Sequence, residues 1–283
     1  MKQHTNHRLA ALTALLLLLF TPLCVGSAAA QYDLLSAKKG AIKGGYNFWV
    51  YTPEDYYYTQ HTTPLILFLH GASLCGRDMN RALRYGCVDA IKMGRDIPAL
   101  IVTPQNPGGA WSPKKLLDIL DWMEANYAFD RNRVYVLGMS LGGYGTLDFV
   151  GTYPERVAAA LALCGGCSLK DQSRLGEAPL WIVHGTADRA VSVKESQKVV
   201  TRMQQAGQTE RLRYDWLKGA SHGALARFFY SSKTYDWLFA HSLLDPTRAV
   251  NREIDITQND LKQAYRDIQR RVDQLEVELN SEQ

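Results

Sequence analysis

Between about residue 40 and residue 244, short apolar runs alternate with segments of helical periodicity. Continuous apolar runs such as Pro64–His70 are typical of strands buried on both faces of a sheet. Apolar spacings of three and four, as in Lys114–Tyr127, indicate helices with one apolar face. The pattern predicts strands at Tyr46–Thr52, Pro64–His70, Ala99–Thr103, Arg133–Leu137, Val157–Leu163, Leu180–His184 and Leu212–Leu217, and helices at Lys114–Tyr127, Leu141–Thr152 and Val193–Gln205. Strands separated by helices predict an α/β fold whose mostly parallel sheet has helices on both faces.

The last part of the chain follows a different pattern. Residues 246–251 are polar and are expected to form a linker. Apolar residues then recur at alternating spacings of three and four, which is a heptad pattern: Leu261, Tyr265, Ile268, Val272, Leu275 and Leu279. This amphipathic helix could fold back on the domain or pair with a second copy of the chain. About three heptads are marginal on their own, so both interpretations stay open.

The N-terminus has the three parts of a secretory signal. Lys2 and Arg8 give a basic start, Leu9–Phe20 is apolar, and small residues end at Ala30. We expect cleavage after Ala30, with export to the periplasm or the medium and no membrane attachment of the mature form. The apolar run is short for an uncleaved anchor helix. A lipid anchor on Cys24 is disfavoured because bulky Leu23 precedes it. The chain then divides into a signal peptide (1–30), a main domain (31–245) and a linker with the heptad helix (246–283).

Composition and net charge indicate which class of protein this is and which partners are not expected. Hydrophobic residues make up 46% of the chain and charged residues 21%, as in ordinary globular proteins. The net charge is +4, and removal of Lys2 and Arg8 with the signal lowers it to +2. No basic block stands out, so nucleic acid is not expected as a partner.

Four cysteines would remain after cleavage, namely Cys75, Cys87, Cys164 and Cys167. An even number in an oxidising compartment permits disulfides, and four cysteines allow three pairings. A Cys164–Cys167 bridge would close a tight turn and could be strained. The zinc interpretation of this C-x-x-C spacing lacks a second cysteine or histidine pair. We therefore expect structural or free thiols, no metal and no cofactor.

The segment Gly138–Gly142 reads G-x-S-x-G and carries the strongest chemical signal. A strand is predicted before it and a helix after it, which is the context of a nucleophile on a sharp strand-to-helix turn. Glycines allow such a turn to close without a clash. Ser140 is therefore the candidate nucleophile.

A serine nucleophile needs a base, and the base needs an acid that orients it. Asp188 follows the strand Leu180–His184, and His222 follows the strand Leu212–Leu217. Since sites form at the carboxyl ends of the strands of open α/β sheets, Ser140, Asp188 and His222 can converge. The other candidate acids and histidines are less well placed than these: His61, Asp148, His184, Glu195, Asp215 and His241.

The oxyanion formed during acyl transfer needs two backbone N–H donors. Leu141, the residue after the nucleophile, is expected to supply one. The loop after the strand that ends at His70 should supply the other, and Ala72 is the candidate. We expect His70 itself to pack under the loop as a structural residue.

The set HGAS, GMSLGG, HGTAD and SHG, in this order, resembles the α/β-hydrolase superfamily. It is most similar to secreted esterases near carbohydrate esterase family 1 and to the catalytic domain of prolyl oligopeptidases. The resemblance covers about Tyr46 to Leu244. It implies a sheet of about eight strands, catalysis through an acyl-enzyme, and no metal. No propeller domain, lid or long hydrophobic cap is visible in the sequence, and the heptad helix lies outside the resemblance.

The resemblance suggests a secreted serine esterase that acts on acetyl or feruloyl esters of plant polysaccharides. Trp111 follows a strand near the same rim, where it could stack on a substrate or pack under its own loop. A serine peptidase for short peptides is one alternative. A non-catalytic binding protein on the same fold is another, although such a protein has no need of Ser140, Asp188 and His222 together.

Overall fold

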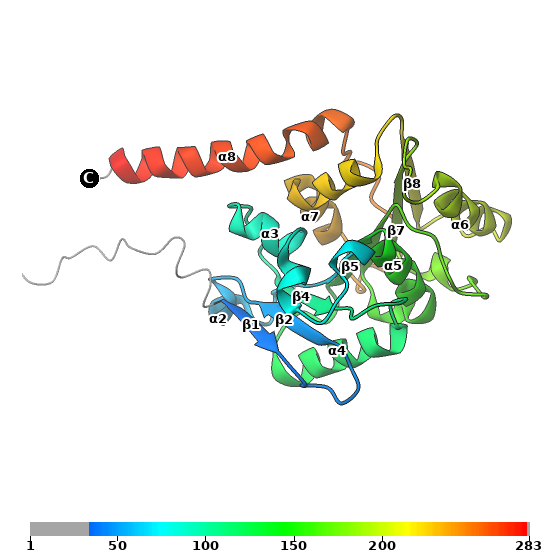
Figure 1. Cartoon of the computed structure of the whole chain (residues 1–283), viewed down its shortest axis with the longest axis horizontal. Coiled ribbons are helices and arrows are strands. Elements are labelled where there is room, and N and C mark those ends of the chain that lie inside the picture. The colour runs from blue at the N-terminus through cyan, green and yellow to red at the C-terminus, as the bar shows by residue number, and fades with distance from the viewer. Residues whose placement is uncertain (1–33, 282–283) are drawn as a thin grey trace, which may run out of the picture. The chain divides into compact units, whose positions relative to one another are not determined.

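The computed structural model describes residues 34–281, with side chains up to residue 269. The predicted signal peptide lies outside the described residues. Eight strands form one sheet in the order β1-β2-β4-β3-β5-β6-β7-β8 (Figure 1). The strands are β1 (Leu35–Lys38), β2 (Asn47–Tyr51), β3 (Leu65–Leu69), β4 (Leu100–Gln105), β5 (Val134–Met139), β6 (Ala159–Leu163), β7 (Leu180–Gly185) and β8 (Leu212–Leu217).

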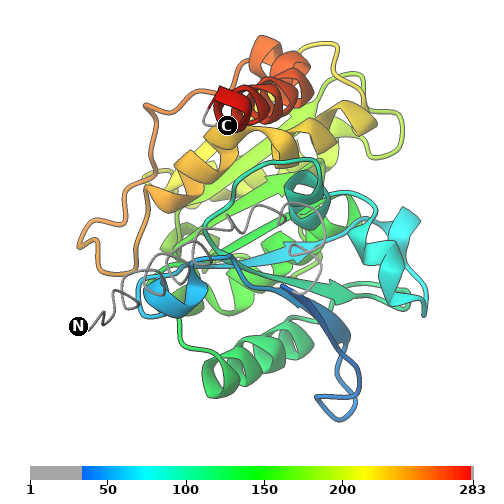
Figure 2. The same cartoon turned by 90° about the vertical axis from the view of Figure 1, so that its left-hand side faces the viewer.

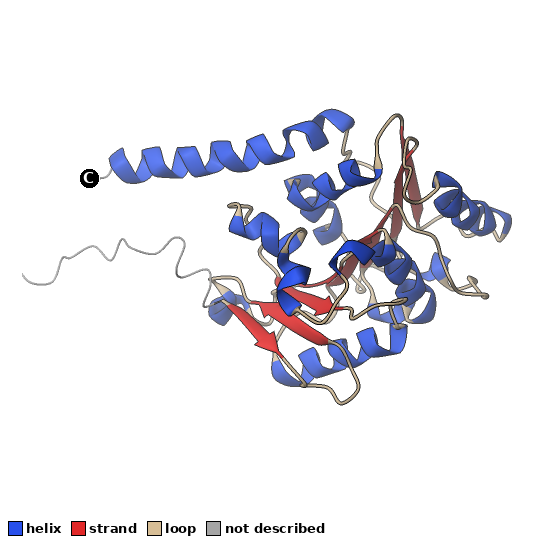
Figure 3. Cartoon of the chain, in the orientation of Figure 1, coloured by secondary structure: helices blue, strands red, loops and turns tan. Residues whose placement is uncertain are grey.

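The sheet is mostly parallel, as predicted. Only β1 pairs with β2, and β2 with β4, in antiparallel register. The six strands from β4 to β8 in the sheet order run parallel to their neighbours. All seven predicted strands are present, and the sequence analysis missed β1. Figure 3 shows the strands together with the helices that surround them.

Helices and helical turns connect the strands. The α-helices are α2 (Tyr56–Thr59), α3 (Cys87–Lys92), α4 (Pro113–Asn126), α5 (Leu141–Thr152), α6 (Val193–Gln205), α7 (Ser232–Phe239) and α8 (Gln258–Ser281). The 3-10 segments are η1 (Ala72–Leu74), η2 (Met79–Leu83), η3 (Pro154–Arg156), η4 (Leu175–Glu177) and η5 (His222–Tyr230). Ser112 and Ser192 cap α4 and α6 by accepting backbone N–H groups, which fixes where these two helices begin.

The central strand β3 shows why both faces of the sheet are covered. Leu65, Leu67 and Leu69 pack in one core with residues of α4, α5 and α6. Ile66 and Phe68 point the other way, into a core shared with α3, η5, α7 and α8. Figure 2 shows α4 on one side of the sheet and α7 with α8 on the other. Since every residue of β3 is buried, an unbroken apolar run is what this position requires.

The beginning of α8 packs against the rest of the domain. Leu261, Ala264 and Ile268 are buried, and the Tyr265 ring packs against the Tyr230 ring at a tilt of 42°, with centroids 4.7 Å apart. Arg95 also donates a hydrogen bond to Ala264 O. The interpretation of a helix folded back on the domain therefore describes the first turns of α8. The later heptad positions lie beyond the side chains that the structure describes.

Two further features of the described residues concern membrane-spanning helices and the cysteines. Within residues 34–281, no helix is both long and apolar enough to cross a membrane. Cys75, Cys87, Cys164 and Cys167 are free thiols. Burial raises the pKa of Cys87 and of Cys167 to about 12, so these two thiols stay protonated at neutral pH.

Candidate active site

Ser140 lies on a strained turn between β5 and α5. Its φ of 60° and ψ of −122° are rare for a residue with a side chain. The backbone N–H of Ser140 donates to Leu163 O at 2.9 Å, which ties the turn to the end of β6. The side chain makes no capping hydrogen bond to α5. The turn predicted from the sequence is thus present, and the hydroxyl is not used to cap the helix.

Asp188 and His222 form a tight acid–base pair. The His222 Nδ1–H donates to Asp188 Oδ2 at 2.6 Å. Asp188 follows β7, and His222 is the first residue of η5, after β8. The Asp188 side chain is fully buried, whereas 24% of the His222 side chain is exposed. With Nδ1 as the donor, Nε2 of His222 is left as the proton acceptor.

Hydrogen bonds keep Asp188 ionised. Burial alone would raise the pKa of this carboxyl, but N–H groups of Val191 and Ala190 and the imidazole of His222 donate to it. The backbone bonds are 2.9 Å and 2.8 Å long and both reach Oδ1. Together they hold the pKa of Asp188 below its usual value, so the carboxylate can orient His222 and stabilise an imidazolium.

Cys164 lies between the acid–base pair and Ser140. Its sulfur, a carboxylate oxygen of Asp188 and a ring nitrogen of His222 all lie within 4.8 Å of one another. The backbone N–H of Ser140 also faces this sulfur. Burial raises the pKa of Cys164, so the thiol is neutral beside the carboxylate. All three predicted catalytic residues are therefore gathered around one buried side chain, at the carboxyl ends of neighbouring parallel strands.

The loop after β3 passes directly beside Ser140. A Cβ placed on Gly71 would lie 3.3 Å from Ser140 Cβ. Ala72 and Leu141, the two predicted oxyanion donors, are the first residues of η1 and α5. N–H groups at the start of a helix have no partner within it. Both positions therefore present backbone donors of the kind an oxyanion requires.

Tyr85 supports this loop and was missed by the sequence analysis. Its hydroxyl oxygen accepts the Gly71 N–H at 2.6 Å, and its ring stacks on Phe229. Tyr85 reaches the site through a tertiary contact and belongs to no motif, whereas Cys164 directly follows β6 and belongs to the C-x-x-C spacing, which the sequence analysis interpreted as structural or free thiols. Only Gly71, which precedes the predicted donor, marked the loop in the sequence.

Trp111 is a correction to the sequence prediction. The side chain is only 3% exposed, and its ring lies edge-on to Tyr46 and His70. Its Nε1–H donates to His70 O at 3.2 Å. A buried ring offers no face to a substrate, so the prediction that Trp111 binds substrate is contradicted. The alternative, a tryptophan packed under its loop, describes the structure.

The other candidate residues have structural roles. His70 is buried, donates to Gly71 O and accepts the Asn106 N–H, as expected for a residue under the loop. His184 is buried too, with Nε2 3.0 Å from Val191 O and 3.2 Å from Asp188 Oδ2. It thus contacts the acid, while its Nδ1 is held 2.7 Å from Ser196 Oγ.

The rival acids are also engaged elsewhere. Asp148 accepts the Ser168 N–H, Asp215 accepts Trp181 Nε1–H, and Glu195 pairs with Lys198. Of the acids weighed from the sequence, Asp188 is the one bonded to His222.

Buried histidines predict a loss of stability in mild acid. Burial lowers the pKa of His70, His184 and His241 from 6.5. Below pH 6.5 the unfolded chain takes up protons that the folded state still refuses. The free energy of unfolding should therefore decrease as the pH is lowered below 6.5, by up to about 1.4 kcal/mol per pH unit for each such proton.

Denaturant titrations at pH 8, 6 and 5 measure this effect, above the range in which carboxyl groups dominate. In a His241→Gln variant the free energy of unfolding should depend less steeply on pH, because one of the three titrating groups is gone. His241 suits this test because it lies past β8 and outside the acid–base pair. Equal free energies of unfolding at pH 8 and pH 5 would contradict the prediction.

Comparisons with known proteins identify the fold. No family model matches the chain. A poly(3-hydroxyalkanoate) depolymerase C from Paucimonas lemoignei is 28% identical over 121 residues, which are 36% of this chain and 28% of the depolymerase. The match therefore spans less than a third of that relative.

Solved structures match over a larger part of the chain. A thermostable esterase superposes with a TM-score of 0.61 and 24% identity, over 75% of this chain and 64% of its own. An acetyl xylan esterase from Aspergillus awamori gives a TM-score of 0.54 and 14% identity, over 66% of this chain and 93% of its own. With its eight-stranded sheet and strand-to-helix turn, the chain has the α/β-hydrolase fold.

Proposed function

We propose that this chain is a serine hydrolase that cleaves carboxylic esters, with Ser140 as nucleophile, His222 as general base and Asp188 as the orienting acid. One observation carries the proposal: the 2.6 Å bond from His222 to a buried, ionised Asp188, next to a serine on a strained turn. A binding protein has no use for this combination. The similarity of the fold to esterases adds support.

In the proposed reaction, His222 Nε2 takes the hydroxyl proton of Ser140 as Oγ attacks the ester carbonyl carbon. The carbonyl oxygen becomes negative and accepts hydrogen bonds from the Ala72 and Leu141 N–H groups. His222 then gives the proton to the departing alcohol, which leaves an acyl group on Ser140. Water, deprotonated by His222, attacks this acyl group. The bond to Ser140 Oγ then breaks, His222 returns the proton to Oγ, and the carboxylic acid is released.

For the substrate, we propose acetyl or feruloyl esters linked to plant polysaccharides, hydrolysed by an exported enzyme. The likeness to an acetyl xylan esterase favours the acetyl form. Hydroxyalkanoate polyesters are a second candidate, favoured by the partial similarity to a depolymerase. Amide cleavage by the same three residues is the remaining chemical alternative.

Two measurements test the proposal. Treatment with a fluorophosphonate should add one phosphonyl group, and peptide mass spectrometry should locate it on Ser140. A panel of p-nitrophenyl acetate, p-nitrophenyl butyrate, methyl ferulate, acetylated xylan, poly(3-hydroxybutyrate) and a proline-containing peptide anilide should then show ester turnover. Turnover of the anilide alone would move the assignment to a peptidase. No labelling and no turnover by a folded protein would overturn the proposal.

A further inference from the structure

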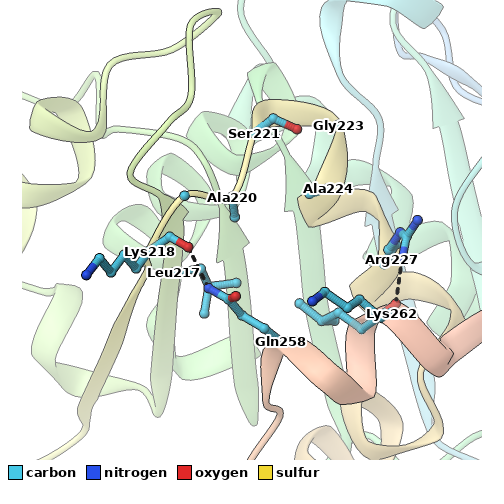
Figure 4. A pocket seen from close by; sticks show the side chains of 11 residues that line it. Leu217, Lys218, Ala220, Ser221, Gly223, Ala224, Arg227, Gln258 and Lys262 are labelled. Carbon is cyan, nitrogen blue, oxygen red and sulfur yellow. Dashed lines mark hydrogen bonds between the residues drawn. The ribbon is translucent and has the colours of Figure 1, made fainter.

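A cavity of about 600 Å³ lies beside the loop that carries His222. The loop after β8 and the start of η5 form one wall, and the first turns of α8 form the other (Figure 4). Gln258 of α8 closes one end by donating a hydrogen bond to Lys218 O at 2.8 Å. The cavity therefore exists because the C-terminal helix packs against the catalytic loop.

The ionisable side chains that line this cavity are all basic: Lys218, Arg227 and Lys262. In Figure 4, Lys262 reaches from α8 towards the middle of the group, whereas Lys218 points away from it. Arg227 lies at the α8 wall, where it donates to Leu261 O at 3.4 Å and lies 5.7 Å from the centre of the Tyr265 ring. Arg227 and Lys262 thus both belong to the lining of the cavity.

Neither Arg227 nor Lys262 forms an ion pair with any side chain described between residues 34 and 269. The acids nearest to them along α8 and the segment before it are engaged elsewhere. Asp255 pairs with Arg213 at 3.1 Å, and Asp260 pairs with Lys233 at 3.0 Å. The positive charge in the cavity is therefore not balanced by these carboxylates and is available to an anion.

The cavity adjoins the proposed reaction centre. Ser221 and Gly223, the two neighbours of His222, both line it. The residues on both sides of the proposed general base therefore form part of the cavity wall. We infer that the cavity binds a carboxylate at the far end of the ester substrate, so that the enzyme prefers esters carrying a negative charge, such as half-esters of dicarboxylic acids or hydroxy-acid oligomers. This inference rests on the proposed esterase function.

Two pairs of substrates, in each of which a free carboxylate is replaced by its methyl ester, test the inference once the rate of each ester without enzyme has been subtracted. The 4-nitrophenyl monoester of glutaric acid carries a free carboxylate, and its methyl ester is the neutral match. A second pair, 4-carboxyphenyl butyrate and its methyl ester, places the charge on the alcohol side. In at least one pair, kcat/KM should be about fivefold to tenfold higher for the free acid, and 0.5 M NaCl should reduce this preference.

Lys262→Gln removes an exposed charge and should reduce the preference about threefold through KM, with the neutral ester unaffected. Arg227→Gln should act in the same way. If the Arg227→Gln variant fails to fold after losing its contact with Tyr265, the result for Lys262→Gln alone is enough to test the inference. Lys43→Gln is the matched control, because Lys43 is exposed between β1 and β2, at the opposite edge of the sheet from β8.

The failure of the inference is distinguishable from failure of the esterase proposal. Equal rates on both members of both pairs, or a preference that survives both substitutions, would overturn the inference while leaving the esterase intact. If no ester is hydrolysed, the esterase proposal fails. Calorimetry with monomethyl glutarate then tests whether the cavity binds a carboxylate. Binding by the native protein that is weaker in Lys262→Gln supports the carboxylate site, and absence of binding overturns it.

Discussion

Replacement of Ser140 by alanine should lower kcat for a simple ester by about 10⁴-fold to 10⁶-fold. The substitution removes the only atom that could bond covalently to the acyl group at this turn. The proposed oxyanion donors Ala72 and Leu141 are backbone groups and stay in place, so KM should change little. Hydrolysis of p-nitrophenyl butyrate by the variant, with burst kinetics for the native protein, measures the effect.

The same substitution should leave the fold intact, which makes the loss of activity interpretable. The Ser140 side chain caps no helix, so its removal orphans no backbone group. Serine and alanine both carry a Cβ, and the φ of 60° strains them alike. We expect a melting temperature close to that of the native protein.

Matched variants separate a catalytic role from a general effect. Ser36→Ala changes a half-buried serine in the edge strand β1 and should retain native activity. His222→Ala should be as inactive as Ser140→Ala, and the double variant should be no worse, because residues that act as a unit are not additive. A Ser140→Ala protein that keeps more than a tenth of native kcat would refute the assignment of the nucleophile.

Elements with strong local signals were predicted well from the sequence. The helices Leu141–Thr152 and Val193–Gln205 have the predicted bounds. Their starts are set locally, by the turn at Ser140 and by the cap at Ser192. The strand β1 was missed because it has four residues of mixed polarity at the sheet edge, where no unbroken apolar run is required. The segment His222–Tyr230 forms 3-10 turns, whose period of three residues differs from the α-helical spacing by which the other helices were predicted.

The site shows the same division between local and tertiary information. Ser140, Asp188 and His222 were found because each ends a strand, and the carboxyl ends of parallel strands meet at one edge. Tyr85 could not be found in this way, since only the packed fold brings it to Gly71. Cys164 directly follows β6 at the same edge of the sheet, but a thiol was not expected to take part in the site. Trp111 was misread because a position near the rim does not reveal whether the ring faces outward.

Replacement of Gly142 by alanine should have the largest effect on stability. A Cβ at this position would lie 1.9 Å from Leu69 O and 2.6 Å from Leu69 C. These are backbone atoms of β3, a fully buried strand that pairs with β5 next to the turn. No side chain can rotate away to make room, so α5 would have to move by more than 1 Å from the sheet.

We expect this variant to lose about 3 kcal/mol or more of its free energy of unfolding. That loss corresponds to a fall in the melting temperature of about 6–12 °C in a domain of this size, or to failure to fold. Gly223→Ala is the matched control, because a Cβ there would meet nothing within 4 Å and its φ lies outside the glycine-favouring range; it should change the free energy of unfolding by less than about 0.5 kcal/mol. Thermal and denaturant unfolding of the two variants measure the difference.

The outcome also bears on catalysis, because the end of β3 leads directly into the loop with Gly71 and Ala72. A displaced α5 moves Ser140 and the Leu141 N–H away from that loop, so a Gly142→Ala protein that still folds should lose activity with Ser140 intact. If this variant melted with the native protein and kept native kcat, the close approach of α5 to β3 would be refuted. The need for glycine at the fifth position of G-x-S-x-G would then have to come from the substrate rather than from the fold.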